Sequence, residues 1–442
     1  MTSTLDSTKT EAPLEGNYFV SAYPPFSSWK KESTRNVLDL LDRPDRSEVE
    51  IPLGLYVHIP FCTVRCLYCY YLSYAGKSDD LIESYLEALV TELSIYGEKT
   101  ALSGREVDFA YFGGGTPSII SAEQIDTLLA ELGKILPWSA LAEITFECAP
   151  TTITEDKLRA LRDGGVTRIS MGVQQLDDDV LKKNGRVHLV RDIEQAYEMF
   201  QRVGFDMVNL DLIVGLVGQS DGSFMTGVDR IIDMAPESVT IYQLEIPKNT
   251  PLYHLYHNNK LDSEPASWRL KRERLRKGFE KLEEAGYQLR SAYTAVREAA
   301  FRPFVYQDAQ YRGGDLIGVG TSSFSYFAGA HYQNLTSVES YLESVQNGQL
   351  PIERTYFLND EERLVREFIL QLKLGRVDGT QFRSKFGIDI FERFAEPIAG
   401  FRRQGLLERR DDQIELTRDG LLEVDHMLPA FYLDVHRGVR YS

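Results

Sequence analysis

Between residues 51 and 243 the chain alternates short apolar runs with amphipathic stretches. The apolar runs are rich in β-branched and aromatic residues, which is typical of buried strands. The stretches between them have apolar residues at helical spacing, and several begin with Ser or Thr, a common helix cap. We count six strands in this region, within 53–61, 107–117, 142–150, 166–174, 207–219 and 238–247. Strands separated by helices predict a parallel sheet with right-handed crossovers.

This pattern alone leaves two architectures open, a doubly wound sheet and a βα-barrel. The residues with evident chemistry decide between them, because all of them fall just after the ends of strands. In βα-barrels the functional residues occupy that end of the strands. We therefore expect an α/β fold with a barrel core at residues 51–265.

The regions that flank the alternation have other patterns. Residues 1–50 are mostly polar, but NYFVSAYPPFSSWK at 17–30 predicts an N-terminal arm laid over a surface. Residues 266–350, with a long charged helix and a Gly/Ser-rich stretch of strand character, are expected to cap the barrel. Residues 351–442 predict a small C-terminal α+β module, in which helices precede the hairpin GLLERRDDQIELT in a winged-helix-like order. Its equal share of acids and bases favours packing on the barrel over DNA binding.

Composition narrows the class of protein. The chain has 442 residues, a net charge of −17 and 43% hydrophobic residues. It has no run of about 18 apolar residues of the kind that spans a membrane, and its polar N-terminus lacks the features of a secretory signal. We expect a cytoplasmic protein. The negative charge argues against a nucleic-acid partner, since phosphate contacts need concentrated Lys and Arg.

Three of the four cysteines, Cys62, Cys66 and Cys69, fall within eight positions after the first strand. Zinc sites usually pair CxxC units separated by a dozen or more residues, and that spacing is absent here. Three thiolates on one loop can instead hold three corners of a cubane [4Fe-4S] cluster and leave one iron open. The alternatives are a zinc site completed by His58 and plain buried thiols. Cys148 stands alone in a strand and is interpreted as structural.

The spacing CxxxCxxC after a strand resembles the radical S-adenosylmethionine (SAM) signature. More closely, LYVHIPFCTVRCLYC resembles the oxygen-independent coproporphyrinogen III dehydrogenase family, also called HemN-like. The resemblance runs nearly the full length and includes SAYPP, GGGTP, FECAP, ISMGVQ, NLDLIVGL and DLIGVGTSSFS. It implies a partial (β/α)6 radical SAM barrel and a [4Fe-4S] cluster held by the three cysteines. It also implies two SAM molecules, a small-molecule substrate and a reduced flavodoxin- or ferredoxin-type electron donor.

Two acids have a chemical reason to bind a ligand. Glu147 and Asp211 lie at strand ends inside apolar runs, where a charge needs a partner. Ribose hydroxyls or an ammonium group would serve, and so would a Lys or Arg of the barrel. The resemblance assigns both acids to SAM, together with Tyr56, Tyr68, Gly114, Gly115, Thr116, Gln174, Arg186, Glu245 and Phe324. It identifies no catalytic residue.

The chain departs from the family at two places. Coproporphyrinogen dehydrogenases carry an additional cysteine where this chain has Tyr71, and haem-chaperone relatives carry HNxxYW where it has YQDAQYR, residues 306–312. The positions assigned to the second SAM, Gln174, Arg186 and Asp211, are kept. These differences favour a two-SAM enzyme that transfers carbon to an sp2 carbon, by methylation or cyclopropanation. The alternatives are coproporphyrinogen III oxidation and a haem chaperone.

Overall fold

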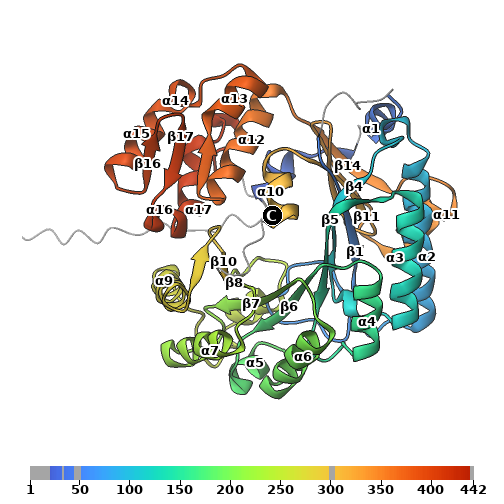
Figure 1. Ribbon diagram of the computed structural model, residues 1–442, viewed down its shortest axis with the longest axis horizontal. Coiled ribbons are helices and arrows are strands. Elements are labelled where there is room, and N and C mark those ends of the chain that lie inside the picture. The colour runs from blue at the N-terminus through green and yellow to red at the C-terminus, as the bar shows by residue number, and fades with distance from the viewer. Residues whose placement is uncertain (1–19, 32–33, 44–50, 298–303, 439–442) are drawn as a thin grey trace, which may run out of the picture.

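The computed structural model describes residues 20–31, 34–43, 51–297 and 304–438. The first half of the expected arm, including Tyr18 and Phe19, lies outside these residues, as do 32–33, 44–50, 298–303 and 439–442. Figure 1 shows an open barrel of strands with helices on its outside and a separate C-terminal module beside it. None of the described helices is both long enough and apolar enough to cross a membrane.

Six parallel strands form the barrel, which confirms the predicted alternation. They lie side by side in chain order as β1 (Leu53–Ile59), β4 (Val107–Gly114), β5 (Trp138–Cys148), β6 (Arg168–Gln174), β7 (Met207–Val214) and β8 (Ser238–Gln243). The helices between them are α2 (Asp79–Gly97), α3 (Ala122–Ile135), α4 (Glu155–Asp163), α5 (Asp178–Lys183), α6 (Val190–Val203) and α7 (Asp221–Met234). Figure 1 shows these helices around the outer face of the strands.

The helices begin where the sequence has capping residues. Ser78 accepts a hydrogen bond from the Leu81 amide at the start of α2, and Ser121 forms a capping box with Gln124 at the start of α3. Such caps pair amide groups that the first turn of a helix leaves free. The helix faces and the outward strand faces share one hydrophobic core, as amphipathic patterning requires.

Strands on both sides extend the barrel sheet. Next to β1 lies a seventh parallel strand, β11 (Asp315–Val319), followed by β12 (Phe324–Phe327), β13 (Ala330–Asn334) and β14 (Ile352–Phe357). Next to β8 lies β10 (Thr294–Arg297), antiparallel to it, and beyond β10 lies β9 (Tyr287–Leu289), antiparallel to β10. Among the described strands, the outermost two, β14 and β9, do not pair with each other, so the barrel is open on one side. The helices of this region are α8 (Pro251–His257), α9 (Trp268–Glu284), α10 (Val305–Tyr311) and α11 (Val338–Gln346).

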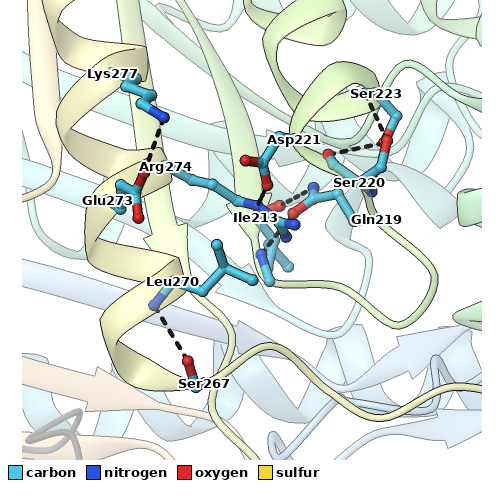
Figure 2. Close-up of polar contacts among 11 residues, drawn as sticks. Ile213, Gln219, Ser220, Asp221, Ser223, Ser267, Leu270, Glu273, Arg274 and Lys277 are labelled. Atoms are coloured by element: carbon cyan, nitrogen blue, oxygen red, sulfur yellow. Dashed lines mark hydrogen bonds and ion pairs between the residues drawn. The ribbon is translucent and has the colours of Figure 1, made fainter.

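Helix α9 holds the loop that follows β7 (Figure 2). Arg274 of α9 donates from Nε to Oδ1 of Asp221 at 2.7 Å, at the start of α7. In the same loop the side-chain amide of Gln219 donates to the Ile213 carbonyl at 2.9 Å, and its oxygen accepts from the Gly215 amide at 2.6 Å. Ser267 caps α9 through the Leu270 amide. These bonds fix the chain just beyond Asp211.

The C-terminal module packs around its own hydrophobic core. Its hairpin of β16 (Leu407–Arg410) and β17 (Gln413–Leu416) confirms the predicted GLLERRDDQIELT turn, and β15 (Arg376–Asp378) adds a third strand. Arg418 pairs with Glu280 and Glu283 of α9, which fastens the module to the barrel. The module's helices are α12 (Asp360–Lys373), α13 (Gly379–Phe386), α14 (Ile390–Arg393), α15 (Ala395–Arg403), α16 (Arg418–Leu422) and α17 (Val424–Met427).

The described part of the arm lies between the barrel and the module. It contains two short 3-10 turns, Val20–Ala22 and Phe26–Ser28, and α1 (Thr34–Leu41). Tyr23 is fully buried, and its hydroxyl accepts from the Leu433 amide at 3.2 Å and lies 3.0 Å from Nδ1 of His436. Its carbonyl oxygen lies 3.0 Å from Nε2 of His331 on β13. The arm thus joins the last residues of the module to the barrel sheet.

Candidate active site

The cysteine loop begins where β1 ends. Cys62 lies in the short strand β2 (Phe61–Cys62), which pairs with β3 (Tyr74–Ala75). Cys66 and Cys69 lie in the loop between these strands, and the Cys69 amide donates to the Cys66 carbonyl at 3.2 Å. All three thiols are free. One loop therefore holds three thiols at the C-terminal mouth of the barrel, where functional groups of such folds gather.

Two side chains donate to the thiols. Arg186 lies 3.2 Å from Cys66 Sγ through Nη1, and Thr116 lies 3.4 Å from Cys62 Sγ through its hydroxyl. Among the described residues, no three His, Cys, Asp or Glu side chains are grouped as a site for one metal ion. A cubane cluster does not need that grouping, since each thiolate binds a different iron. Three thiols on one loop are the donor set that a cubane cluster with one open iron requires.

The glycines after β4 bring that strand close to the cysteine loop. Gly114 has a φ of +111°, and a Cβ there would lie 2.6 Å from the His58 ring. A Cβ on Gly115 would lie 2.6 Å from the Phe61 carbonyl oxygen. The Thr116 amide donates to the same carbonyl at 2.8 Å. The bare backbone leaves this edge open to a ligand, which is the usual reason for glycine at a close approach.

Glu147 and Asp211 lie inside the barrel. The Tyr111 hydroxyl donates to Glu147 at 2.6 Å, whereas Asp211 accepts from Asn209 at 2.8 Å and from Ser170 at 3.2 Å. Burial raises the pKa of Glu147 to about 7 and that of Asp211 to about 6, and the Asp211 charge adds to the rise at Glu147. Within the described residues neither carboxylate is hydrogen-bonded to Lys or Arg. Of the two, Asp211 still has a barrel arginine nearby, since the charge of Arg168 acts to lower its pKa.

Gln174 and Arg186 meet over Gly172 of β6. A Cβ on Gly172 would lie 2.6 Å from the side-chain amide nitrogen of Gln174 and 3.7 Å from Nη2 of Arg186. Arg186 Nη2 donates a hydrogen bond to the Gly172 carbonyl at 2.9 Å. Gln174 has a φ of 67° at a shift in the β6–β7 register. A left-handed non-glycine residue costs conformational energy and is frequent at functional sites. In the register Gly172 faces Asp211, so Gln174 and Asp211 lie on neighbouring strands, and Arg186 reaches them from the loop after α5 through its bond to the Gly172 carbonyl.

Tyrosines line the rest of the barrel interior. Tyr56 stacks on Tyr111 at 6.1 Å between ring centroids, and Tyr306 of α10 lies 4.7 Å from Tyr111. Figure 1 shows α10 at the centre, between the barrel and the module. Tyr71 and Tyr242 are 46% and 47% exposed, yet burial raises the pKa of both phenols. Both rings are therefore about half accessible to water and close to the Glu147 and Asp211 carboxylates, which also raise the pKa of both phenols.

The remaining predicted residues lie at the rim of this interior. Tyr68 packs against the small cluster of Val180, Leu216, Val217, Leu244 and Leu252. Glu245 follows β8 with one carboxylate oxygen buried and without a partner among the described residues, and burial raises its pKa. The Phe324 ring faces Phe26 and Trp29 of the arm. The Phe324 backbone passes close to Gly318, which pairs with Tyr56 in the β1–β11 register.

The sequence interpretation did not identify Tyr111, Tyr242, Tyr306 or Arg168 as site residues. The positions of Tyr111 in β4 and Tyr242 in β8 could have been inferred from the sequence, because alternate residues of a strand point to the same face of the sheet. Arg168 is buried beneath the Phe304 ring at 4.3 Å. No local pattern predicts the position of Tyr306, because it reaches the interior through a helix outside the six βα units.

Comparisons with known proteins agree with this geometry. Residues 56–231 match the family model of the radical SAM superfamily, and residues 358–422 match that of the HemN C-terminal domain. "Heme chaperone HemW" of Escherichia coli is 30% identical over 86% of this chain and 98% of its own length. The chain belongs to the HemN-like family of radical SAM proteins. "Oxygen-independent coproporphyrinogen III oxidase" of Pseudomonas aeruginosa is 29% identical, with 88% of each chain covered.

A solved structure shows the same fold as this HemN-like chain. Coproporphyrinogen III oxidase (HemN) from Escherichia coli superimposes with a TM-score of 0.79 at 24% identity, over 95% of this chain and 99% of that one. The match confirms the partial radical SAM barrel with its C-terminal module. Family membership implies a [4Fe-4S] cluster and SAM. The thiols with their hydrogen-bond donors and the bare Gly114–Gly115 edge fit both groups.

Proposed function

We propose that this protein is a radical SAM enzyme that abstracts hydrogen inside its tyrosine-lined barrel. Three thiols at the mouth of the barrel, two of them within reach of a side-chain donor, carry the proposal. Cys62, Cys66 and Cys69 would hold the cluster. When cluster and SAM are bound, one electron splits SAM into methionine and a 5′-deoxyadenosyl radical, chemistry that belongs to the cofactors and not to the protein.

The protein's own residues bind and orient the reactants. The Arg186 guanidinium places a positive charge beside Cys66 and keeps its position through the Gly172 carbonyl. Glu147 and Asp211 supply acceptors for ribose hydroxyls or an ammonium group. The interior is lined by the aromatic rings of Tyr56, Tyr111 and Tyr306. These rings would keep water away from a reactive intermediate.

Gln174, Arg186 and Asp211 support binding of a second SAM, since Gln174 and Asp211 lie on the neighbouring strands β6 and β7 and the Arg186 guanidinium contacts β6 at Gly172. We propose that this second SAM donates a carbon. For methylation, one substrate C–H, two SAM and two electrons give one C–CH3 group, methionine, 5′-deoxyadenosine and S-adenosylhomocysteine. The two electrons come from a low-potential one-electron donor.

The interior supports a substrate with conjugated carbons and without several carboxylates. Tyr71 and Tyr242 offer accessible rings, and rings favour stacking on flat π-systems. The nearby charges are the carboxylates of Glu147 and Asp211, which contribute to the raised pKa of both phenols. An additional polyanion there would be repelled. Arg168 is the cation that acts on Asp211, and the acid that acts most strongly on Arg168 itself is Glu143.

The second candidate is oxygen-independent coproporphyrinogen III oxidation. The named oxidase of Pseudomonas aeruginosa aligns over 88% of this chain, and the described arm and module remain packed on the barrel. Two relatives are named "Heme chaperone HemW", so haem binding is a third candidate function. The experiment must distinguish it from the two enzymatic functions.

Analysis of SAM products tests these candidates. The anaerobically reconstituted and reduced protein is expected to form both 5′-deoxyadenosine and S-adenosylhomocysteine, measured by mass spectrometry with and without coproporphyrinogen III. Protoporphyrinogen formation would establish the oxidase instead. Stoichiometric haem binding with negligible SAM turnover would establish a chaperone. Zinc without iron after anaerobic purification would overturn all three.

The pKa of Glu147 predicts pH-dependent SAM binding. A carboxyl with a pKa of about 7 is mostly protonated at pH 6 and mostly ionised at pH 8. Because the ionised form is the better acceptor for hydroxyl or ammonium groups, SAM is expected to bind about tenfold more tightly at pH 8 than at pH 6. In Glu147→Gln the affinity is expected to be weaker and to lose most of this dependence. Equilibrium dialysis of SAM across this range measures both, and an unchanged pH profile in the variant would contradict the assignment.

A further inference from the structure

The surface around the cysteine loop is built from three segments that are hydrogen-bonded to one another. They are residues 63–70 of the loop, residues 182–188 at the end of α5, and residues 247–252 at the start of α8. The Leu67 amide donates to the Asn184 carbonyl at 3.2 Å, and the Leu252 amide donates to the Leu67 carbonyl at 2.8 Å. The Asn249 amide side chain donates to the Tyr70 carbonyl at 3.1 Å. We name this continuous surface the cysteine-loop face.

The cysteine-loop face is basic on an acidic protein. Its three segments contain no Asp or Glu, although the whole chain has 66 acids against 49 Lys and Arg; the acids of α5, Asp178 and Asp179, lie at the opposite end of that helix. Four of its cations are exposed: Arg65, Lys182, Lys183 and Lys248. None of these four forms an ion pair with another described residue. Their positive charge is therefore available to a partner.

Apolar side chains are exposed on the same face. Val64 in the loop is 46% exposed, and Val187 after α5 is 53% exposed. Each lies next in sequence to an arginine, Arg65 and Arg186. Apolar contacts with surrounding charges are typical of protein interfaces, and small ones suit transient electron-transfer encounters.

This face is also the protein surface next to the thiols. Arg65 donates to the Cys69 carbonyl at 3.2 Å and to the Asn249 carbonyl at 3.3 Å. Arg186 donates to Cys66 Sγ at 3.2 Å. A Cβ on Gly185 would lie 3.3 Å from the Leu67 amide nitrogen, so α5 and the loop are in close contact. A partner seated here would have one layer of residues between itself and the cysteines.

We propose that the cysteine-loop face docks an acidic one-electron carrier protein. This inference rests on the proposed function, which requires electrons at the cluster. In each encounter the reduced carrier loses one electron and the oxidised cluster gains it, with no bond made or broken. Complementary charge steers such encounters and makes their rate depend on salt. The overall charge of −17 would otherwise repel an acidic carrier, so the basic face determines where the carrier can bind.

Charge reversal on this face tests the proposal. The variant K182E/K183E changes two exposed lysines that do not contact the cysteines, and R402E/R403E makes the same charge change on α15 of the module. The probe is a reduced flavodoxin of net negative charge, and the readout is the rate of cluster reduction by stopped-flow absorbance. At low salt K182E/K183E is expected to slow reduction at least tenfold and to flatten its salt dependence. R402E/R403E is expected to stay within twofold of the unchanged protein.

Reduction by sodium dithionite separates docking from the cluster itself. A small reductant does not need a docking face, so its rate is expected to be the same in all three proteins. Equal flavodoxin rates in K182E/K183E and the unchanged protein would overturn the proposal. If no cluster can be assembled, the proposed function fails, but the docking proposal can still be tested by measuring flavodoxin binding by calorimetry. A tenfold weaker affinity in K182E/K183E would support docking at the cysteine-loop face. An unchanged affinity would overturn it.

Discussion

The Cys66→Ser protein is expected to lose its iron–sulfur cluster and, with it, SAM cleavage. A serine hydroxyl binds iron far more weakly than a thiolate, and the Arg186 donor that faces Cys66 at 3.2 Å would face a neutral group instead. Because the cluster supplies the electron, we expect 5′-deoxyadenosine formation to fall by about 1,000-fold or more. Iron and sulfide content per chain and the spectrum of the reduced protein measure cluster loss directly.

Cys148→Ser provides the matched control, since it removes the remaining thiol of the chain. Cys148 is buried in β5 and belongs to the hydrophobic core behind the strands. This variant is expected to keep its cluster and SAM cleavage, with a modest loss of stability from a polar group in the core. A full cluster with unchanged turnover in Cys66→Ser would contradict the assignment of the ligands.

The second large effect is expected on the stability of the fold, from substitution of Glu92. This buried residue accepts hydrogen bonds from three groups in the protein interior. Its carboxylate accepts from the Gly320 amide at 2.8 Å, from the Asn334 side chain at 2.6 Å and from the Tyr341 hydroxyl at 2.7 Å. Glu92→Ala leaves the Gly320 amide and the Tyr341 hydroxyl without an acceptor, and Asn334 keeps only its bond to the Gly320 carbonyl at 3.0 Å. We expect a loss of about 3 kcal/mol or more in unfolding free energy, since each unpaired donor costs on the order of 1 kcal/mol or more. Glu87→Ala, an exposed position on the same helix, is the control and is expected to change little.

The pKa of Glu92 predicts how this contribution depends on pH. Burial raises it from 4.5 to about 7 despite the three donors. The folded state therefore binds the proton more tightly than the unfolded chain does. The resulting stability is fully present below pH 4.5 and is lost as the pH rises through 7, by roughly 3 kcal/mol in all.

Glu92→Gln resembles the protonated acid at every pH and removes this dependence. The stability advantage of the unchanged protein over Glu92→Gln is therefore expected to shrink between pH 5 and pH 8. Thermal unfolding of both proteins across this range measures the difference. An advantage that grows with pH would show that the ionised form is the one the fold favours.

The strands and the loop with the thiols could be predicted because their signals are local. A period of two residues, a cap such as Ser121 and three cysteines within eight positions are visible in short windows of sequence. Since parallel strands end at one edge of the sheet, Glu147 and Asp211 could also be placed at the same end. The structure adds that burial raises the pKa of both acids.

Other features depend on contacts between distant segments. The left-handed conformation of Gln174 has no signal in its sequence, because such backbone is predicted for glycine and not for glutamine. The contact between Arg186 and Cys66 spans 120 positions of the chain. The strand β15 has only three residues, too few for a period to appear. Tertiary packing decides each of these, and the sequence around them carries no matching pattern.

The burial of Tyr23 has a consequence for the order in which the protein can be assembled. Its hydroxyl partners, Leu433 and His436, lie 410 and 413 positions further along the chain. During synthesis the arm emerges about 400 residues before the segment that receives the Tyr23 hydroxyl. The complete set of Tyr23 contacts can therefore form only after residue 436 has been synthesised, so docking of the arm is a late event in folding.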